Sequence, residues 1–102
     1  MIRVNVLYPA QPDATFDWDY YLAKHIPLVT RLLTPALQET IVEQGLGGEA
    51  PGSPPVYVAM AHLKFESIAA FQTAFGPHAD EITADIANYT TITPLVQISE
   101  VK

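Results

Sequence analysis

The chain has 102 residues, of which 49% are apolar and only 16% are charged, and its formal net charge is −6. This length fits a single domain over residues 1–102, and the composition excludes a disordered chain. With 11 acidic against 5 basic residues, the chain lacks the basic surface that nucleic acids or anionic membranes require, so we expect neither as a partner.

The absence of cysteine excludes disulfides, thiolate catalysis and cysteine-based metal sites. No apolar run approaches the roughly 20 residues that cross a bilayer, and the first strand is interrupted by polar side chains where a signal peptide would be apolar. We therefore expect a cytoplasmic protein. The low charged fraction leaves little polar surface for a small monomer, which favours burial of apolar surface against a partner subunit.

The first half of the chain predicts a strand, a helix and a second strand. Residues 2–8 alternate between two faces and predict a strand that ends at Pro9. Residues 17–34 carry apolar side chains at helical spacing. Pro27 removes the hydrogen bond to the Ala23 carbonyl, so we expect this helix to bend or split. Residues 38–44 predict a short strand, and a loop rich in glycine and proline follows at 45–55.

The second half predicts a strand, a helix in two pieces and a last strand. The run VYVAMAHLKF, residues 56–65, is the strongest strand signal and pairs with 38–44 in a long-tipped hairpin. Ser67 can cap a helix that Gly76-Pro77 breaks, a shorter helical piece follows, and residues 92–101 predict the last strand. The order βαββαβ predicts an α+β, ferredoxin-like fold with an antiparallel sheet and two helices on one face.

The strand at 56–65 is apolar on both sides. Val56, Val58 and Met60 point to one face, and the set that begins with Tyr57 and Ala59 points to the other. Helices can cover only one face, so the second apolar face needs another cover. Either the long loop or the C-terminus folds over it, or two subunits pack sheet against sheet. We favour the homodimer, because uncovered apolar patches of this size are rare on monomers.

The sequence predicts neither a bound cofactor nor a metal. Residues 45–50, GLGGEA, fit the pattern G-x-G-x-x-A, but PGSPP follows where a dinucleotide-binding turn requires a helix. The three histidines lie on three different predicted elements, without metal-ligand spacing or evident carboxylate partners.

His25 is the leading candidate for chemistry. It lies four residues after Tyr21 on the helix face that we expect to pack on the sheet. A buried, neutral histidine beside a pocket can act as acid or base. The alternative is a core histidine hydrogen-bonded to a backbone carbonyl or to Tyr21. For His62, which shares a strand face with Met60, and for His78, at the helix break, packing and capping are the simpler interpretations.

Several blocks of the chain, taken in order, resemble the EthD family, named after ethyl tert-butyl ether degradation. They are VNVLYP, F-x-x-x-YYLAKHIPLV, GLGGEAPGSPPVYVAMAHLKF, FGPHADEI and NYTTITPLVQISEV, and the resemblance runs from residue 2 to residue 101. It implies a dimeric α+β barrel, in which two ferredoxin-like sheets pack face to face. The family's K-H-x-P-L block falls on Lys24, His25, Pro27 and Leu28, its F-G-P-H block on residues 75–78, and its N-Y-T block on residues 88–90.

The resemblance implies a small-molecule enzyme of oxidoreductase type or an accessory to an oxygenase pathway, and some relatives resemble dehydratases or decarboxylases. We expect a pocket for a small hydrophobic molecule between sheet and helices. The predicted catalytic residues are His25, as acid or base, and Tyr21, which orients it or lines the pocket. The predicted substrate-binding residues are His62, Met60, Trp18, Phe75 and His78. Two alternatives remain: a non-catalytic dimeric protein that binds a hydrophobic ligand, and a haem-binding barrel with one histidine as axial ligand.

Overall fold

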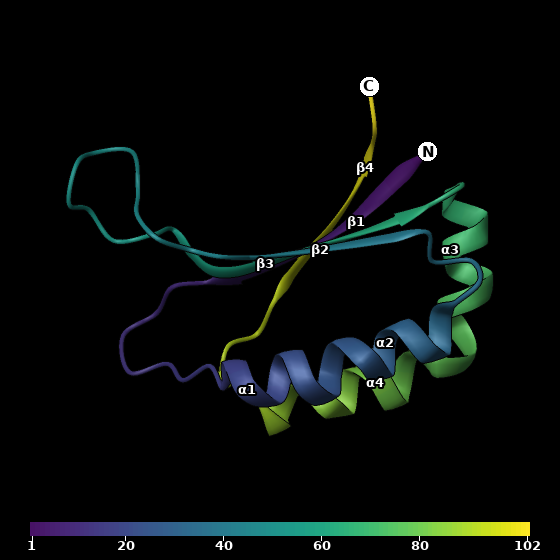
Figure 1. The fold of residues 1–102 in the computed structure, drawn as a ribbon, viewed down its shortest axis with the longest axis horizontal. Coiled ribbons are helices and arrows are strands. Elements are labelled where there is room, and N and C mark those ends of the chain that lie inside the picture. Colours follow the sequence, from purple (N-terminus) through teal and green to yellow (C-terminus); the bar gives the residue numbers. More distant parts are fainter.

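The computed structural model describes residues 1–102, with four antiparallel strands in the order β2-β3-β1-β4. The strands are β1 (Ile2–Pro9), β2 (Glu39–Gln44), β3 (Tyr57–Phe65) and β4 (Leu95–Glu100). The helices are α1 (Trp18–Tyr20), α2 (Ile26–Leu33), α3 (Ile68–Phe75) and α4 (Ala79–Asp85). Figure 1 shows α1, α2 and α4 along one face of the sheet, with α3 at one end of it. This arrangement confirms the predicted α+β, ferredoxin-like fold.

The helices α1 and α2 form one continuous helix, joined by a π-helical turn over Tyr21–His25. Asp17 caps its start by accepting a hydrogen bond from the Tyr20 N–H. In the π turn the Ile26 N–H donates to the carbonyl of Tyr21, five residues earlier. Pro27, which has no N–H to donate, follows directly after this turn, where the altered hydrogen bonding of the helix accommodates it. The interruption predicted at Pro27 is therefore a π turn, and the helix is not split.

The last strand begins three residues later than predicted. Ile92 belongs to the buried core, and its N–H donates to the Thr90 side chain. Pro94 has no N–H for the sheet, so regular pairing starts at Leu95. The cap predicted at Ser67 is confirmed, since its hydroxyl accepts from the Ala70 N–H. None of the helices has both the length and the apolar character to cross a membrane.

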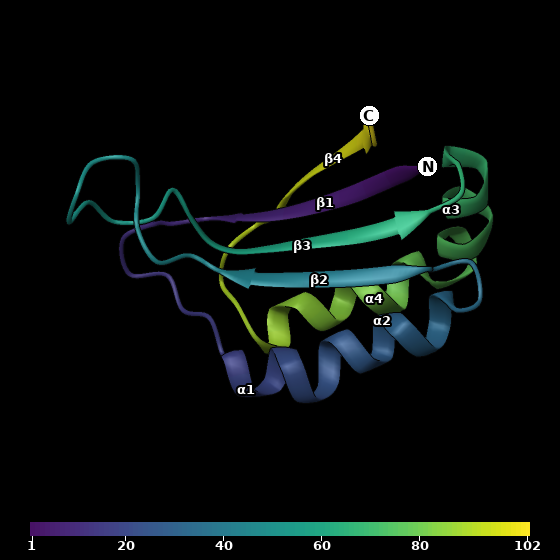
Figure 2. The ribbon, with the colours of Figure 1, turned by 45° about the horizontal axis from the view of Figure 1, so that its top comes forward.

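Figure 2 shows the helices beneath the sheet. The core fills the layer between them in two clusters. Alternation along β1 and β3 sends every second side chain toward the helices, beginning with Ile2 and Ala59. One cluster is mainly aliphatic and contains Ile2, Val4, Val29, Leu33, Leu37, Leu63, Phe65 and Ile82. The other is mainly aromatic and contains Tyr8, Tyr21, Ala59, Tyr89 and Ile92. The tyrosines place buried hydroxyls at one end of this layer.

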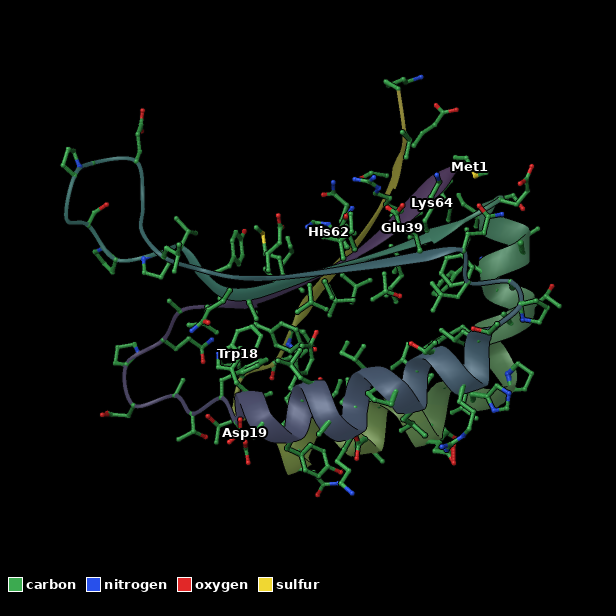
Figure 3. The ribbon with its side chains drawn as sticks, in the orientation of Figure 1. Met1, Trp18, Asp19, Glu39, His62 and Lys64 are labelled. Atoms are coloured by element: carbon green, nitrogen blue, oxygen red, sulfur yellow. The ribbon has the colours of Figure 1, made fainter.

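The sheet face away from the helices is less apolar than predicted. Val58 and Met60 do point to it, but His62 and Lys64 continue the same side of β3, and Figure 3 shows both on the side away from the helices. Val56 precedes β3 and is 68% exposed, so it is not part of this face.

A polar row crosses all four strands on this outer face. The two ring nitrogens of His62 contact Glu43 Oε1 at 2.8 Å and Asn5 Oδ1 at 2.7 Å. Asn5 Nδ2 in turn donates to the Ser99 hydroxyl and the Gln97 carbonyl, at 3.1 and 3.2 Å. The prediction of a second apolar face is therefore wrong for this part of the sheet. It fails because it rests on Val56, Val58 and Met60, whereas His62 and Lys64 continue the same alternation along β3.

Candidate active site

A cavity of about 330 Å³ lies between the sheet and the helices, at the predicted place. Its size falls at the small end of the roughly 300–1,000 Å³ that is usual for ligand pockets. Thirteen of its sixteen lining residues are hydrophobic, among them Val6, Leu63, Phe71 and Phe75. Val96 of β4 also lines it and is 60% exposed, so this side of the cavity reaches the surface.

His25 is the main polar group in this apolar lining and is 5% exposed. Its Nδ1 lies 2.8 Å from Asp85 Oδ2 at the end of α4. An ionised carboxylate only accepts hydrogen bonds, so Nδ1 carries the proton and Nε2 holds the lone pair in neutral His25. This partner differs from both alternatives predicted for a core histidine, a backbone carbonyl or Tyr21.

Nε2, the second nitrogen of His25, has no hydrogen-bond partner in the protein, and it is not fully enclosed. Arg3 Nε is the only fully enclosed side-chain polar atom without a partner. Since His25 itself lines the cavity, its free lone pair is available to a bound molecule. Burial lowers the pKa of His25, an effect that the Asp85 carboxylate only partly offsets, so the imidazole is neutral at pH 7.

Asp85 is held by two further donors besides His25. The Tyr20 hydroxyl donates to its Oδ1 at 2.6 Å, and Asn88 Nδ2 donates to the same oxygen at 3.0 Å. Burial pushes the pKa of Asp85 upward, but these hydrogen bonds and the one to His25 outweigh it and leave the pKa below its usual range. Asp85 is therefore an ionised, oriented partner that fixes the tautomer of His25.

The imidazole of His25 also packs against two aromatic rings that contact each other. The ring of Tyr21 stacks on it at a centroid distance of 5.6 Å and an angle of 17°. Tyr89 packs against it at 4.6 Å. The π turn places Tyr21 and His25 over one another, in keeping with the frequent occurrence of such turns at functional sites. The helix, the end of α4 and the segment after it thus converge on one imidazole.

Three of the seven predicted site residues line the cavity: His25, Tyr21 and Phe75. Met60 and His62 point to the opposite face of the sheet, because the neighbouring positions on β3 face the helices. Trp18 does not line the cavity, and its ring centroid lies 5.6 Å from that of Tyr21. His78 borders a separate surface groove between the end of α2 and α3. The predicted contact of these four side chains with the cavity is therefore not observed.

The predicted set lacked Asp85, Tyr20 and Asn88, the residues that bind or orient His25. Asp85 is 60 residues from His25 in the sequence and 65 residues from Tyr20, so residue spacing could not connect them. The one available signal was the N-Y-T block at residues 88–90, which marks the segment directly after Asp85.

The structure shows no three-ligand cluster of ionisable side chains and no helix after the glycine-rich segment. No group of three or more His, Cys, Asp or Glu side chains comes close enough to hold a metal ion. The glycine-rich segment at 45–50 leads into a loop that Figure 1 shows extending beyond the sheet, and no helix begins there.

Comparisons with known proteins agree with this architecture. The family model of the EthD domain matches residues 10–93 of the sequence. An EthD-like protein from Ralstonia eutropha JMP134 is 47% identical, with 98% of this chain and 90% of that chain covered and a TM-score of 0.93. An uncharacterised 11.0 kDa protein from the thcB-thcC intergenic region of Rhodococcus erythropolis is 37% identical over 94 residues, which cover 89% of this chain and 85% of the relative.

A more distant structure shares the fold. It is a dimeric ferredoxin-like protein of unknown function from Thermobifida fusca, 17% identical, with 98% of this chain and 90% of that chain covered and a TM-score of 0.62. The extent of the domain match and the identity of the nearer relatives confirm the resemblance derived from the sequence blocks. The chain belongs to the EthD family.

Proposed function

We propose that the cavity binds a small, largely apolar molecule and that His25 moves a proton to or from it. One observation carries this proposal: a histidine–aspartate pair with one ring nitrogen free lines an otherwise apolar cavity. A polar pair of this kind costs free energy in a core, and a ring nitrogen without a partner there adds to that cost unless a bound molecule or water pairs with it.

The chemistry follows from the tautomer. The lone pair of Nε2 takes a proton from an acidic O–H or C–H bond of the bound molecule, and the electron pair of that bond stays on the molecule as an anion. The imidazolium that forms keeps its Nδ1–H on the Asp85 carboxylate, which compensates the new charge. This proton transfer is the part of an oxidoreductase-type or dehydratase-type reaction that the chain's own side chains can supply.

Deuterium exchange tests the proposal with small probe molecules in place of the natural substrate. Small aromatic ketones and phenols are first screened for binding by thermal unfolding, and binders with an acidic C–H bond are then incubated with protein in D₂O. We expect the protein to accelerate C–H exchange, detected by NMR. His25→Ala should abolish the acceleration. His78→Ala, a histidine outside the cavity, should retain it. Equal exchange with wild type and His25→Ala contradicts the proposal.

The alternative function is binding without turnover, and the apolar lining of the cavity favours it. In that case His25 would only orient a ligand through one hydrogen bond. Ligands that bind, and whose affinity falls in His25→Ala, but that undergo no exchange with any variant would support this alternative. In the cell, such a binding protein would act as an accessory to an oxygenase.

We also propose a homodimer formed through the outer face of the sheet. The outer face has an apolar part that consists of Leu7, Ile41, Val58, Met60 and Leu95. The polar row beside it is hydrogen-bonded within the subunit, so burial leaves few polar groups unpaired. The Thermobifida fusca protein of the same fold is dimeric, which supports this proposal.

Light scattering at micromolar concentration tests the dimer. Met60→Asp should yield a folded monomer, because it places a charge in the packed face. Leu22→Asp alters an exposed apolar side chain on the π turn and should leave the mass unchanged. A monomeric wild type would contradict the proposed assembly.

A further inference from the structure

Three tyrosines from different elements meet beside His25, and proton transfer alone does not explain them. Tyr8 of β1, Tyr21 of the π turn and Tyr89 after α4 are each at most 3% exposed. Their ring centroids lie 5.0 to 6.1 Å apart. Hydroxyl groups concentrated in a core cost free energy unless each finds a hydrogen-bond partner. The hydrogen-bond partners of these three hydroxyls therefore indicate whether the cluster is purely structural or binds a ligand.

The tyrosine cluster leaves at least one of its three hydroxyl protons without an acceptor in the protein. Each tyrosine carries one O–H donor. The hydroxyls of Tyr8 and Tyr89 are hydrogen-bonded at 2.7 Å, and either can be the donor. The Tyr21 hydroxyl also interacts with Tyr8, so these two links use at most two of the three protons. Tyr8 and Tyr21 line the cavity, whereas Tyr89 does not. The cavity is therefore the place where a tyrosine hydroxyl can donate to a ligand.

An acceptor and donors therefore occur together in an apolar space. The lone pair of His25 Nε2 can accept a proton, and the hydroxyls of Tyr21 and Tyr8 can donate hydrogen bonds. A hydrocarbon would leave all of these groups unmatched. A carboxylate, already ionised at pH 7, would give His25 nothing to remove. An enol or phenol matches both sides, because its oxygen gives up a proton to the base and then accepts hydrogen bonds as an anion.

We infer that the cavity takes the enol or phenol form of a small apolar molecule and binds its oxygen between His25 Nε2 and the Tyr21 hydroxyl. Tyr8 contributes a second donor, and Tyr89 acts as a positioning residue through its hydrogen bond to Tyr8. The inference rests on the proposed function, since His25 receives the proton. In the step, the ligand O–H bond breaks, an N–H bond forms at Nε2, and the electron pair remains on the ligand oxygen.

The protonation states fit this role. Burial raises the pKa of Tyr21 and of Tyr89, and the neighbouring Tyr8 raises both further, so the cluster donates and does not ionise. Preorganised donors directed at developing negative charge in a site shielded from water are a strong source of anion stabilisation. The cluster thus specifies the class of ligand, whereas His25 and Asp85 specify the reaction step.

A pair of probes separates the two roles. The first is 4-nitrophenol, whose phenolate form is detected by its absorbance, and the second is nitrobenzene, which lacks the hydroxyl. At a pH where free 4-nitrophenol is mostly protonated, wild type should bind it as the phenolate. Tyr21→Phe should weaken 4-nitrophenol binding about tenfold, the loss typical of one hydrogen bond to a charged group. Its affinity for nitrobenzene should stay within about twofold of that of wild type.

Further variants keep the test decisive. Tyr8→Phe should also lose affinity for 4-nitrophenol and retain its affinity for nitrobenzene. If Tyr21→Phe does not fold, Tyr8→Phe takes its place in the test. Tyr57→Phe, a tyrosine of β3 outside the cavity, should match wild type. His25→Ala should bind 4-nitrophenol without ionising it.

Each adverse outcome has its own meaning. Unchanged phenolate binding in both Tyr21→Phe and Tyr8→Phe overturns the oxyanion site and leaves the base intact. Ionisation of the bound probe by His25→Ala overturns the proposed base, while a loss in the tyrosine variants still supports the oxyanion site. Failure of wild type to bind either probe contradicts both proposals, because a cavity of this size and lining should accept them.

Discussion

The substitution Asp85→Asn tests how the His25 tautomer is set. Oδ1 of Asp85 accepts from Tyr20 and Asn88, whereas Oδ2 accepts from His25. An asparagine oxygen can replace Oδ1 and keep two donors satisfied. Its NH₂ group then faces His25 Nδ1, where two donors would meet. We expect the imidazole to respond by moving its proton to Nε2, so that Nδ1 becomes an acceptor.

The expected magnitudes differ between stability and function. Three hydrogen bonds to a charged acceptor become bonds between neutral groups, and the difference amounts to about 1–3 kcal/mol in the free energy of unfolding. For a chain of this length such a loss lowers the unfolding midpoint by several degrees. The protein therefore stays folded at room temperature. The function should nonetheless be lost, because a protonated Nε2 cannot accept a proton from the ligand.

Long-range ¹H–¹⁵N correlation NMR reports the tautomer directly, and D₂O exchange of a bound carbon acid reports the function. Wild type should show the proton on Nδ1 of His25, and Asp85→Asn should show it on Nε2. Asp80→Asn, an exposed carboxylate of the same helix α4, serves as the matched control and should retain both properties. A wild-type His25 that carries its proton on Nε2 would refute the assignment of base and orienting partner.

Three further predictions concern pH, the cavity and a helix cap. In the folded state the pKa of His25 is lowered below its ordinary value of 6.5. The unfolded chain therefore binds this proton more readily than the folded chain. As a result, the free energy of unfolding should fall as pH decreases through about 6.5. Urea titrations between about pH 7 and 5 should show this slope in wild type and a flatter curve in His25→Gln. Ala61→Leu places three extra carbons in the cavity from β3. It should abolish 4-nitrophenol binding and change the free energy of unfolding by less than about 1.5 kcal/mol. A much larger loss of stability would mean that the space is already filled. Ser67→Ala removes the cap of α3 and should cost about 1 kcal/mol in thermal unfolding, with no effect on binding.

Local signals predicted the fold well because each element carries its own pattern. The alternation in β1 and β3, the helical spacing after residue 17 and the Ser67 cap all act within a few residues, and the structure has an element at each place. The boundary of β4 moved because Pro94 lacks an N–H and Ile92 packs in the core. The π turn before Pro27 is a backbone solution that residue spacing does not distinguish from a kink.

The candidate site was harder to predict because its parts come from distant segments. Helical spacing identified Tyr21 and His25 as neighbours facing the sheet. Asp85 is 60 residues from His25 in sequence, and only the packing of α4 beside α2 brings their side chains together. Period-two alternation on β3 already separates Met60 and His62 from the side chains that face the helices. Their assignment to the same pocket as His25 conflicted with that alternation.

A crystal structure of the protein soaked with 4-nitrophenol tests the central claim most directly. The phenol oxygen should lie within hydrogen-bonding distance of both His25 Nε2 and the Tyr21 hydroxyl, inside the cavity between sheet and helices, with the ring against Phe71 and Phe75. A probe bound only in the groove beside His78, or on the outer face of the sheet at His62, would contradict the account.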